Sequence, residues 1–208
     1  MPAARYLFRL TGKRILDICG ASAVLVLLLI PMLIVAAAIR LTSSGPAIFR
    51  QRRVGKCGRL FIIYKFRSMY RDSSERLSEV AQMNHPGPDS ITFKMPRDPR
   101  ITPIGRWLRR SSVDELPQLW NVLRGDMSLV GPRPPLPEEV MRYTSEQRRR
   151  LDTLPGLTGL AQISGRADLP FDQQVRLDLY YLQHGNLRLD FRILLETVPA
   201  VVSARGAY

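Results

Sequence analysis

Residues 111–125, with the sequence SSVDELPQLWNVLRG, combine a helical pattern with two adjacent carboxylates. Apolar side chains recur at the i, i+3, i+4, i+7 spacing of a buried helical face: Leu116, Leu119, Trp120 and Leu123. Gly125 is placed to end this helix, which we expect to begin at about Asp114. With Asp114 as the N-cap, Pro117 falls at the third helical position, where its missing N–H would have had no intrahelical partner.

The helix start has a chemical consequence for the acidic pair. Free N–H groups and the helix dipole favour an ionised carboxylate at Asp114. Neighbouring helical residues point about 100° apart, so Asp114 and Glu115 should perform separate tasks. One carboxylate could attack phosphorus while the other holds Mg²⁺, which is commonly bound by one or two carboxylates and substrate phosphates. The alternative is purely structural, with Asp114 as a helix cap and Glu115 as a solvated acid.

Composition limits the chemistry further. The 208 residues suit one domain, and a net charge of +13, from 31 Lys and Arg against 18 Asp and Glu, predicts an anionic partner. Nucleic acid, an anionic membrane and a pyrophosphate substrate all fit. The chain has only two cysteines, without CxxC spacing, and two histidines, which argues against a zinc site, a disulfide framework or a histidine relay. Catalysis would therefore use carboxylates or lysine.

An uncharged apolar run from Ile18 to Ile39 is long enough to cross a bilayer as a helix. Pro31 interrupts it, and both flanks are basic, so the positive-inside rule gives no orientation. A re-entrant helix that turns at Pro31 and returns to the same face satisfies both flanks; a kinked crossing remains the alternative. A cleaved signal peptide is disfavoured, because the run exceeds the usual apolar length of about 7–15 residues.

The rest of the chain predicts a hairpin and further helices. Residues 47–53 and 60–69 are β-prone and are joined by a glycine-containing connection at 54–58. Period-2 alternation places Lys65 and Arg67 on one face, either as substrate contacts or as a solvated basic edge. Residues 72–98 suggest a helix and a long loop, a candidate lid. Helices are expected at 171–184 and 190–202, and the apolar stripe of the second could face the core or a membrane interface.

Several longer motifs occur in a specific order. The run 104–134 contains SVDELPQL and NVLRGDMSLVGPRP, and it is preceded by VG at 54–55 and YKFRSM at 64–69. It is followed by PGLTGLAQ at 155–162, SGR at 164–166 and LDLYY at 177–181. Over essentially the whole chain, this order resembles the bacterial monotopic phosphoglycosyl transferases, also called bacterial sugar transferases. The chain length resembles the small, catalytic-domain-only type.

The resemblance implies an α+β, membrane-associated monotopic fold with a re-entrant, proline-broken helix, a β-hairpin and several amphipathic helices. Residues 1–41 would form the membrane helix with its basic flank, and 42–208 the catalytic domain. Pro31 matches the helix break, although many members have Ser-Pro where this chain has Ile30-Pro31. That difference leaves one hydroxyl fewer to satisfy backbone groups at the bend.

The resemblance also implies roles for individual residues. Asp114 would be the nucleophile that forms a covalent phosphosugar, and Glu115 a magnesium ligand. The remaining matched positions are expected to bind substrate: Lys65, Arg67, Arg133, Gln162, Arg166 and Asp178.

The implied reaction transfers a sugar-1-phosphate from a UDP-sugar to polyprenyl (undecaprenyl) phosphate, giving UMP and polyprenyl-diphosphate-sugar, the first membrane step of glycoconjugate assembly. The enzyme would lie at the cytoplasmic face of the bacterial inner membrane, where the basic run 148–150 either contacts anionic lipid headgroups or is solvated. The sugar, the pathway and the oligomeric state, a homodimer included, stay open. Two other classes fit less well: a membrane-tethered nucleic-acid-binding protein, which would lack a recognisable binding module, and a non-catalytic scaffold.

Overall fold

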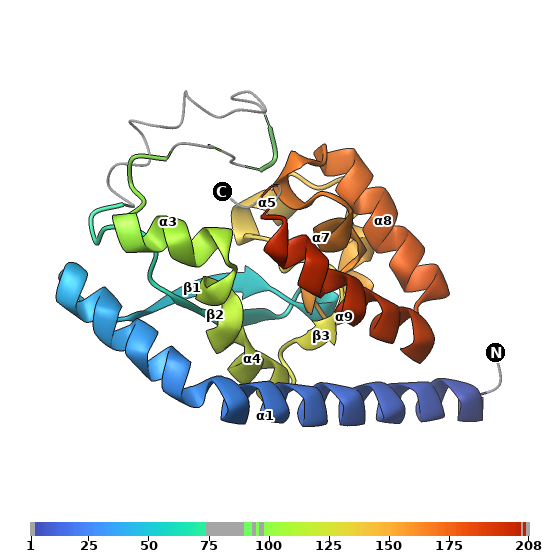
Figure 1. Ribbon diagram of the computed structural model, residues 1–208. Helices are drawn as coiled ribbons and strands as arrows, with labels where there is room; N and C mark the ends of the chain where they lie inside the picture. Colours follow the sequence, from blue (N-terminus) through green and yellow to red (C-terminus); the bar gives the residue numbers. More distant parts are fainter. Residues whose placement is uncertain (1–2, 74–89, 93–94, 96–97, 205, 207–208) are drawn as a thin grey trace.

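The structure is a computed structural model that describes residues 3–73, 90–92, 95, 98–204 and 206, with side chains from residue 11 onward. The candidate lid at 72–98 falls largely outside the described residues. Short strands and many helices form the α+β fold predicted from the sequence (Figure 1). The helices of the described part are α1 (Ala3–Thr42), α3 (Pro103–Arg110), α4 (Leu119–Arg124), α5 (Pro137–Met141), α6 (Ser145–Arg148), α7 (Leu160–Ser164), α8 (Phe171–His184) and α9 (Leu187–Val202). The 3-10 turns are η1 (Lys56–Gly58), η3 (Val113–Gln118), η4 (Arg149–Asp152) and η5 (Arg166–Asp168).

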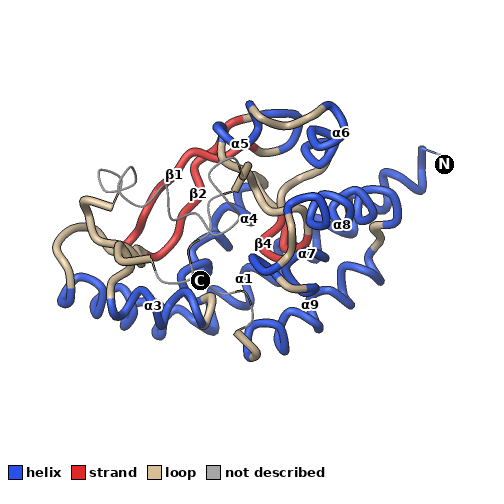
Figure 2. The backbone as a smooth tube through the Cα atoms, turned by 90° about the horizontal axis from the view of Figure 1, so that it is seen from above, coloured by secondary structure: helices blue, strands red, loops and turns tan. Residues whose placement is uncertain are grey.

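The predicted hairpin is confirmed. Strands β1 (Ile48–Val54) and β2 (Leu60–Phe66) pair antiparallel, with Ile48 opposite Phe66 and Val54 opposite Leu60. Figure 2 shows this hairpin on one side of the molecule and β4, α7 and α8 on the other, with α4 between them. Ile63 is buried and Lys65, on the same face of β2, is half-buried, so this face of the hairpin looks toward the interior.

A second, parallel strand pair lies at the centre of the fold. Strand β3 (Ser128–Val130) pairs with β4 (Gly156–Thr158). The backbone at Gly131, just after β3, passes very close to the backbone at Gly156 in β4. A Cβ on Gly156 would lie 2.0 Å from the backbone nitrogen of Gly131. Only glycine allows that approach. Backbone hydrogen bonds hold the segment that begins at Gly131 against residues 155–159: Gly131 N donates to Thr158 O and Gly156 N donates to Pro132 O.

The acidic stretch begins differently from the prediction. Residues Val113–Gln118 form the 3-10 turn η3, and Ser112, not Asp114, precedes it with a positive φ of 56° and no side-chain cap. A 3-10 turn advances about 120° per residue instead of about 100°, which rotates the following face. Val122 is therefore fully buried, whereas Trp120 is 54% exposed. The predicted end is confirmed, since Gly125 terminates α4 with a φ of 83°.

Helix α1 runs along the whole domain and bends midway (Figure 1). Pro31 lies inside it and accounts for the bend, because a proline removes one helical hydrogen bond. Its first half packs against α4, β3 and α9 through Ala21, and its second half packs Ile39 against Phe66 and Leu108. Within the described residues, α1 is the one helix long and apolar enough to cross a membrane.

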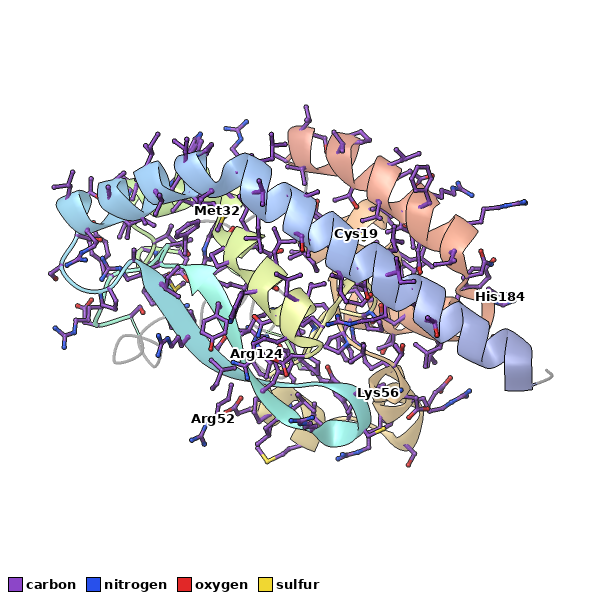
Figure 3. All side chains as sticks on the ribbon, turned by 90° about the horizontal axis from the view of Figure 1, so that it is seen from below. Cys19, Met32, Arg52, Lys56, Arg124 and His184 are labelled. Carbon is purple, nitrogen blue, oxygen red and sulfur yellow. The ribbon has the colours of Figure 1, made fainter. Side chains whose placement is uncertain are left out.

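Much of the apolar surface of α1 and α9 is exposed. Figure 3 shows the two helices side by side on the underside of the molecule. Helix α9 begins at Leu187, capped by the side chain of Asn186, three residues before the expected start. Most of the apolar side chains expected on one face of this helix point outward. Ile193 lies in the core, and Leu194 packs against it. The exposed apolar side chains of the two helices include Val26, Leu27, Ile30, Leu33, Ile34, Phe191, Leu195, Val198 and Val202.

Candidate active site

Asp114 occupies the second position of η3 and is 7% exposed. Burial raises the pKa of its carboxyl to about 6, and the neighbouring charge of Glu115 adds to this rise, while Lys65 and Arg109 oppose it. The sequence predicted the reverse, an N-cap whose ionisation the helix start favours. The difference arises because the Ser112 turn places Asp114 inside the fold rather than at an open helix end.

Glu115 points toward the hairpin. Its Oε1 accepts a hydrogen bond from Lys65 Nζ at 2.6 Å, and the Glu115 side chain stays 38% exposed. Although burial opposes ionisation, the charge of Lys65 holds the pKa of Glu115 below its ordinary value, with further help from Arg133 and Arg166. The two neighbouring carboxylates are thus driven in opposite directions, which separates their chemical roles.

A cleft with about 340 Å³ of empty space opens beside Glu115. We call it the cationic cleft; its walls are Arg53, Ile63, Lys65, Glu115, Gln118, Arg133, Pro134, Gly156, Leu157 and Gln162. Three of its side chains are cations from the hairpin and from the segment after β3. Such a cleft can hold a small anionic group and neutralise its charge.

Arg53 is the buried cation of this cleft, at 7% exposure. Its Nη1 donates to Pro134 O at 3.1 Å and its Nη2 to Gln51 Oε1 at 2.7 Å. Burial, followed by repulsion from Arg133, lowers the pKa of Arg53 to about 9. A buried guanidinium without a carboxylate partner gains from any anion that enters.

The structure brings together most of the substrate-binding residues that the sequence suggested. Lys65, Arg133 and Gln162 line the cationic cleft with Glu115, and Asp114 is adjacent in η3. Arg166 lies at the start of η5, with a φ of 54°, close enough for its charge to stabilise ionised Glu115.

Arg67 and Asp178 lie elsewhere. The Arg67 guanidinium donates to Ser43 O at 2.8 Å and also to Ser44 O, just beyond the C-terminal end of α1. Asp178 is buried and pairs with Arg150. Arg150 is therefore not free for lipid headgroups, unlike Arg148 and Arg149, which are exposed.

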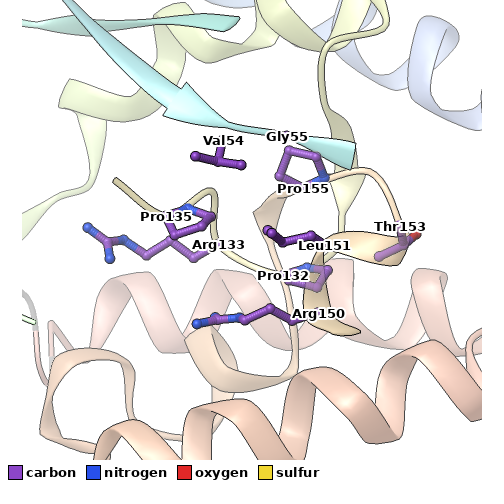
Figure 4. Close-up of a pocket in the computed structure, with 9 residues that line it drawn as sticks. All are labelled: Val54, Gly55, Pro132, Arg133, Pro135, Arg150, Leu151, Thr153 and Pro155. Atoms are coloured by element: carbon purple, nitrogen blue, oxygen red, sulfur yellow. The ribbon is translucent and has the colours of Figure 1, made fainter. Parts of the chain in front are cut away.

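A second, smaller pocket of about 180 Å³ shares Arg133 with the cationic cleft. It is lined mainly by proline and aliphatic side chains around the end of β1, with Arg133 and Arg150 on one side (Figure 4). Arg133 stands at the boundary between the two spaces because it lines both of them. Its side chain is exposed, and its Nη1 lies 3.9 Å from Glu139 Oε1.

Two cleft residues escaped the sequence analysis. Arg53 is one of three arginines in the strand 48–54, and only its inward position distinguishes it from exposed Arg52. Gln118 was not considered, because the sequence analysis followed only the apolar face and the two carboxylates of the expected helix. Its spacing of three residues from Glu115, which puts both on one face of a helix or a 3-10 turn, is the signal that could have found it.

The oxygen ligands near the cleft fit Mg²⁺ only in part. Among the described residues no group of three or more metal-binding side chains occurs. Glu115, half-exposed at the cleft, and Asp114 beside it supply at most two carboxylates. That donor set suits a magnesium ion whose other ligands are substrate phosphates and water, and not a protein-enclosed site.

A cationic cleft lined by Glu115, with Asp114 next to it, in a domain that carries a long apolar helix, is suited to transfer of a phosphorylated group at a membrane. The model of the family described as bacterial sugar transferase matches residues 8–204, and the chain belongs to this family.

Relatives are similar over nearly all of the chain. It is 46% identical to the galactosyl transferase CpsE of Streptococcus agalactiae, over 95% of this chain and 44% of that protein. It is 43% identical to the undecaprenyl-phosphate galactose phosphotransferase of Salmonella typhimurium, over 94% of this chain and 41% of that protein. It is 40% identical to the exopolysaccharide production protein ExoY of Rhizobium meliloti, over 95% of this chain and 88% of that protein. The chain thus spans less than half the length of the first two.

Proposed function

We propose that the protein transfers a sugar-1-phosphate from a UDP-sugar to undecaprenyl phosphate, or a similar polyprenyl phosphate, through a covalent intermediate on Asp114. The observation that carries this proposal is the placement of Asp114 beside a Lys65-paired Glu115 at a cleft with two further cations. Family membership and the name of the Salmonella typhimurium relative, which specifies a lipid-phosphate acceptor, support it.

In the first step, an Asp114 oxygen attacks the β-phosphorus of the UDP-sugar, and the bond to the UMP oxygen breaks. In the second, an oxygen of the polyprenyl phosphate attacks the same phosphorus, and the bond to Asp114 breaks, which restores the carboxylate. Lys65, Arg53 and Arg133 neutralise the diphosphate as charge moves onto the leaving group. With a pKa of about 6, Asp114 is ionised at neutral pH and is still basic enough to be a good nucleophile.

Magnesium is a further part of the proposal. When bound, the ion would neutralise charge on the diphosphate. Glu115 would hold it through the carboxylate oxygens left over from the Lys65 contact. Lys65 keeps Glu115 ionised, which a metal ligand requires.

We further propose that the protein is monotopic, at the cytoplasmic face of the bacterial inner membrane. Polar contacts near one end of α1 support this, since Lys13 Nζ lies 2.9 Å from Asp190 Oδ2 in α9. At the other end, Arg67 holds Ser43 and Ser44, and these contacts belong to the same domain. The exposed apolar side chains of α1 and α9 would then enter a single leaflet, and the exposed cations Arg148 and Arg149 could meet anionic headgroups.

The covalent intermediate gives a direct test. Purified protein mixed with a UDP-sugar and Mg²⁺, without lipid acceptor, should release up to one UMP per chain and gain the mass of one phosphosugar. Asp114→Asn should lose the adduct and at least about 10³-fold of turnover, because an amide cannot replace the attacking carboxylate. Intact-protein mass spectrometry and UMP release measure both effects, with UDP-galactose first among the donors. An adduct of unchanged yield in Asp114→Asn would refute the assignment of the nucleophile.

A further inference from the structure

Unpaired polar atoms gather in the cationic cleft. Among the described residues, Gln118 Nε2, Gln162 Oε1 and Arg53 Nε are buried and have no hydrogen-bond partner. All three side chains line this one cleft. Gln118 is only 3% exposed. A buried polar group without a partner typically costs about 1–3 kcal/mol, so a cluster of them in one cleft points to a ligand that completes their hydrogen bonds.

The local folds bring the two glutamines to the cleft. Gln118 follows Glu115 by three residues in η3, where positions three apart share a face, and both side chains line the cleft. Gln162 comes from α7 and lines the same cleft. Gly159 makes room for it, because a Cβ at that position would lie 2.9 Å from Gln162 Oε1 and 2.3 Å from Gly131 O.

The cleft offers two kinds of polar side chain. Arg53, Lys65 and Arg133 are pure donors and match phosphate oxygens, which only accept. Each glutamine amide has one donor end and one acceptor end. An amide pair therefore suits a group that both donates and accepts, such as a hydroxyl. A phosphate would leave an amide carbonyl without a donor.

We propose that Gln118 and Gln162 bind a hydroxyl of the sugar attached to the transferred phosphate, so that the enzyme discriminates against donors that lack this hydroxyl. This inference rests on the proposed function. The uracil base, with an N–H beside a carbonyl, has the same donor and acceptor chemistry. The uracil is the less suitable ligand because it lies farther from the reacting phosphorus. A ribose and a second phosphate stand between the uracil and the β-phosphorus, whereas the sugar is bonded to the β-phosphate directly. Gln118 lines the cleft together with Glu115, where the proposed mechanism puts the reacting phosphate.

The test uses the full chain in detergent and the UDP-sugar that the wild-type protein turns over fastest. Its monodeoxy analogues are compared with the parent donor by kcat/KM for UMP release. In the wild type, at least one analogue should be about 10- to 100-fold poorer. Gln118→Met and Gln162→Met should lose about 10- to 100-fold on the parent donor and less than about 3-fold on that analogue, so that discrimination collapses. Methionine keeps the shape without the amide.

Controls separate folding, base recognition and failure of the proposed function. Gln183→Met, exposed on α8, should behave as wild type. The two cleft variants should melt at the same or a higher temperature, since each removes an unpaired buried group. If both variants still discriminated fully between the parent donor and the deoxy analogue, the inference would be overturned. If they lost discrimination only against a donor that carries N3-methyluridine, the amides would be assigned to the base instead of the sugar. If the wild type releases no UMP from any UDP-sugar, the proposed function fails, and calorimetric binding of parent and deoxy donors to the same variants still decides the role of the glutamines.

Discussion

In the proposed mechanism Asp114 must be ionised to attack phosphorus, and yet it is among the buried charged residues of the protein. The charges of Lys65 and Arg109 favour ionisation of Asp114. Neither side chain makes a close ion pair with Asp114, and Lys65 is bound to Glu115 instead. The burial that raises its pKa also raises its basicity as a nucleophile. The residue is therefore tuned for reaction at a cost in stability, as active-site charges often are.

This cost predicts a dependence of stability on pH. An aspartate ionises near pH 4 in an unfolded chain, but Asp114 ionises at about pH 6 in the folded protein. The folded state binds this proton more tightly, so its stability falls as pH rises from about 4 to about 6. Asp114→Asn should therefore be more stable than the wild type at pH 8, by about 1–3 kcal/mol, and equal to it near pH 4. Thermal unfolding at the two pH values measures this, and equal stability at pH 8 would show that the buried charge costs nothing.

The positions of side chains were predictable where they follow from local sequence and not where they depend on distant partners. Strand alternation placed Lys65 on one face of the hairpin, and this face does look toward the interior, where Lys65 meets Glu115. Arg67, two residues later on the same face, instead binds the end of α1, and Asp178 binds Arg150, 28 positions away. Nothing in the neighbouring sequence distinguishes a cation that meets a phosphate from one that meets a helix end.

At the scale of elements, the hairpin and the end of α4 were correctly predicted, because glycine and alternation encode them locally. The start of the acidic helix was not, because the left-handed Ser112 and the 3-10 geometry of η3 depend on packing against β2. That local irregularity has a function in the proposed mechanism, since it buries Asp114 and brings Gln118 and Glu115 to the same cleft.

Three polar residues in the first half of helix α1 join it to the rest of the domain: Lys13, Arg14 and Asp17. Arg14 donates to Val122 O and Leu123 O, both at 2.6 Å, and so binds the C-terminal carbonyls of α4. Asp17 Oδ1 accepts from Leu129 N at 2.8 Å and from Ser128 Oγ at 2.9 Å. These contacts hold the connection between α4, which follows the acidic pair, and β3, which leads to Arg133.

Loss of one such contact should weaken the whole domain. Asp17→Ala leaves a buried N–H and hydroxyl of β3 without an acceptor, so we expect a loss of about 1–3 kcal/mol in the free energy of unfolding. Cys19→Ala, two residues along the same helix and exposed, is the matched control and should change it little. Thermal unfolding in detergent compares them. If the two variants unfolded together with the wild type, α1 would be a membrane anchor that contributes nothing to the catalytic fold.

At the scale of the whole molecule, α1 has domain contacts at both ends. Lys13 and Ile39 are separated by about 40 Å of helix, more than the hydrocarbon core of about 30 Å, and each contacts the same domain. A straight crossing would place these contacts on opposite sides of the membrane, so it would have to break one set.

This geometry predicts that tags at the N-terminus and the C-terminus lie on one side of the membrane. In spheroplasts both should resist added protease, and in inverted vesicles both should be cleaved. Pro31→Ala should lower the fraction of chains with both tags on that side, because an alanine helix does not bend there. Protection of one tag and cleavage of the other in the wild type would indicate a crossing helix and exclude the monotopic proposal.

The partners of α1 also impose an order on the making of the protein. Lys13 binds Val130 O at 3.0 Å and Asp190 at 2.9 Å, groups that lie 117 and 177 positions further along the chain. During synthesis α1 therefore leaves the ribosome well before these partners, and Lys13 stays without its carboxylate until up to 177 further residues have been made. A nascent chain that stalls before α9 would lack Asp190 and could not complete this ion pair.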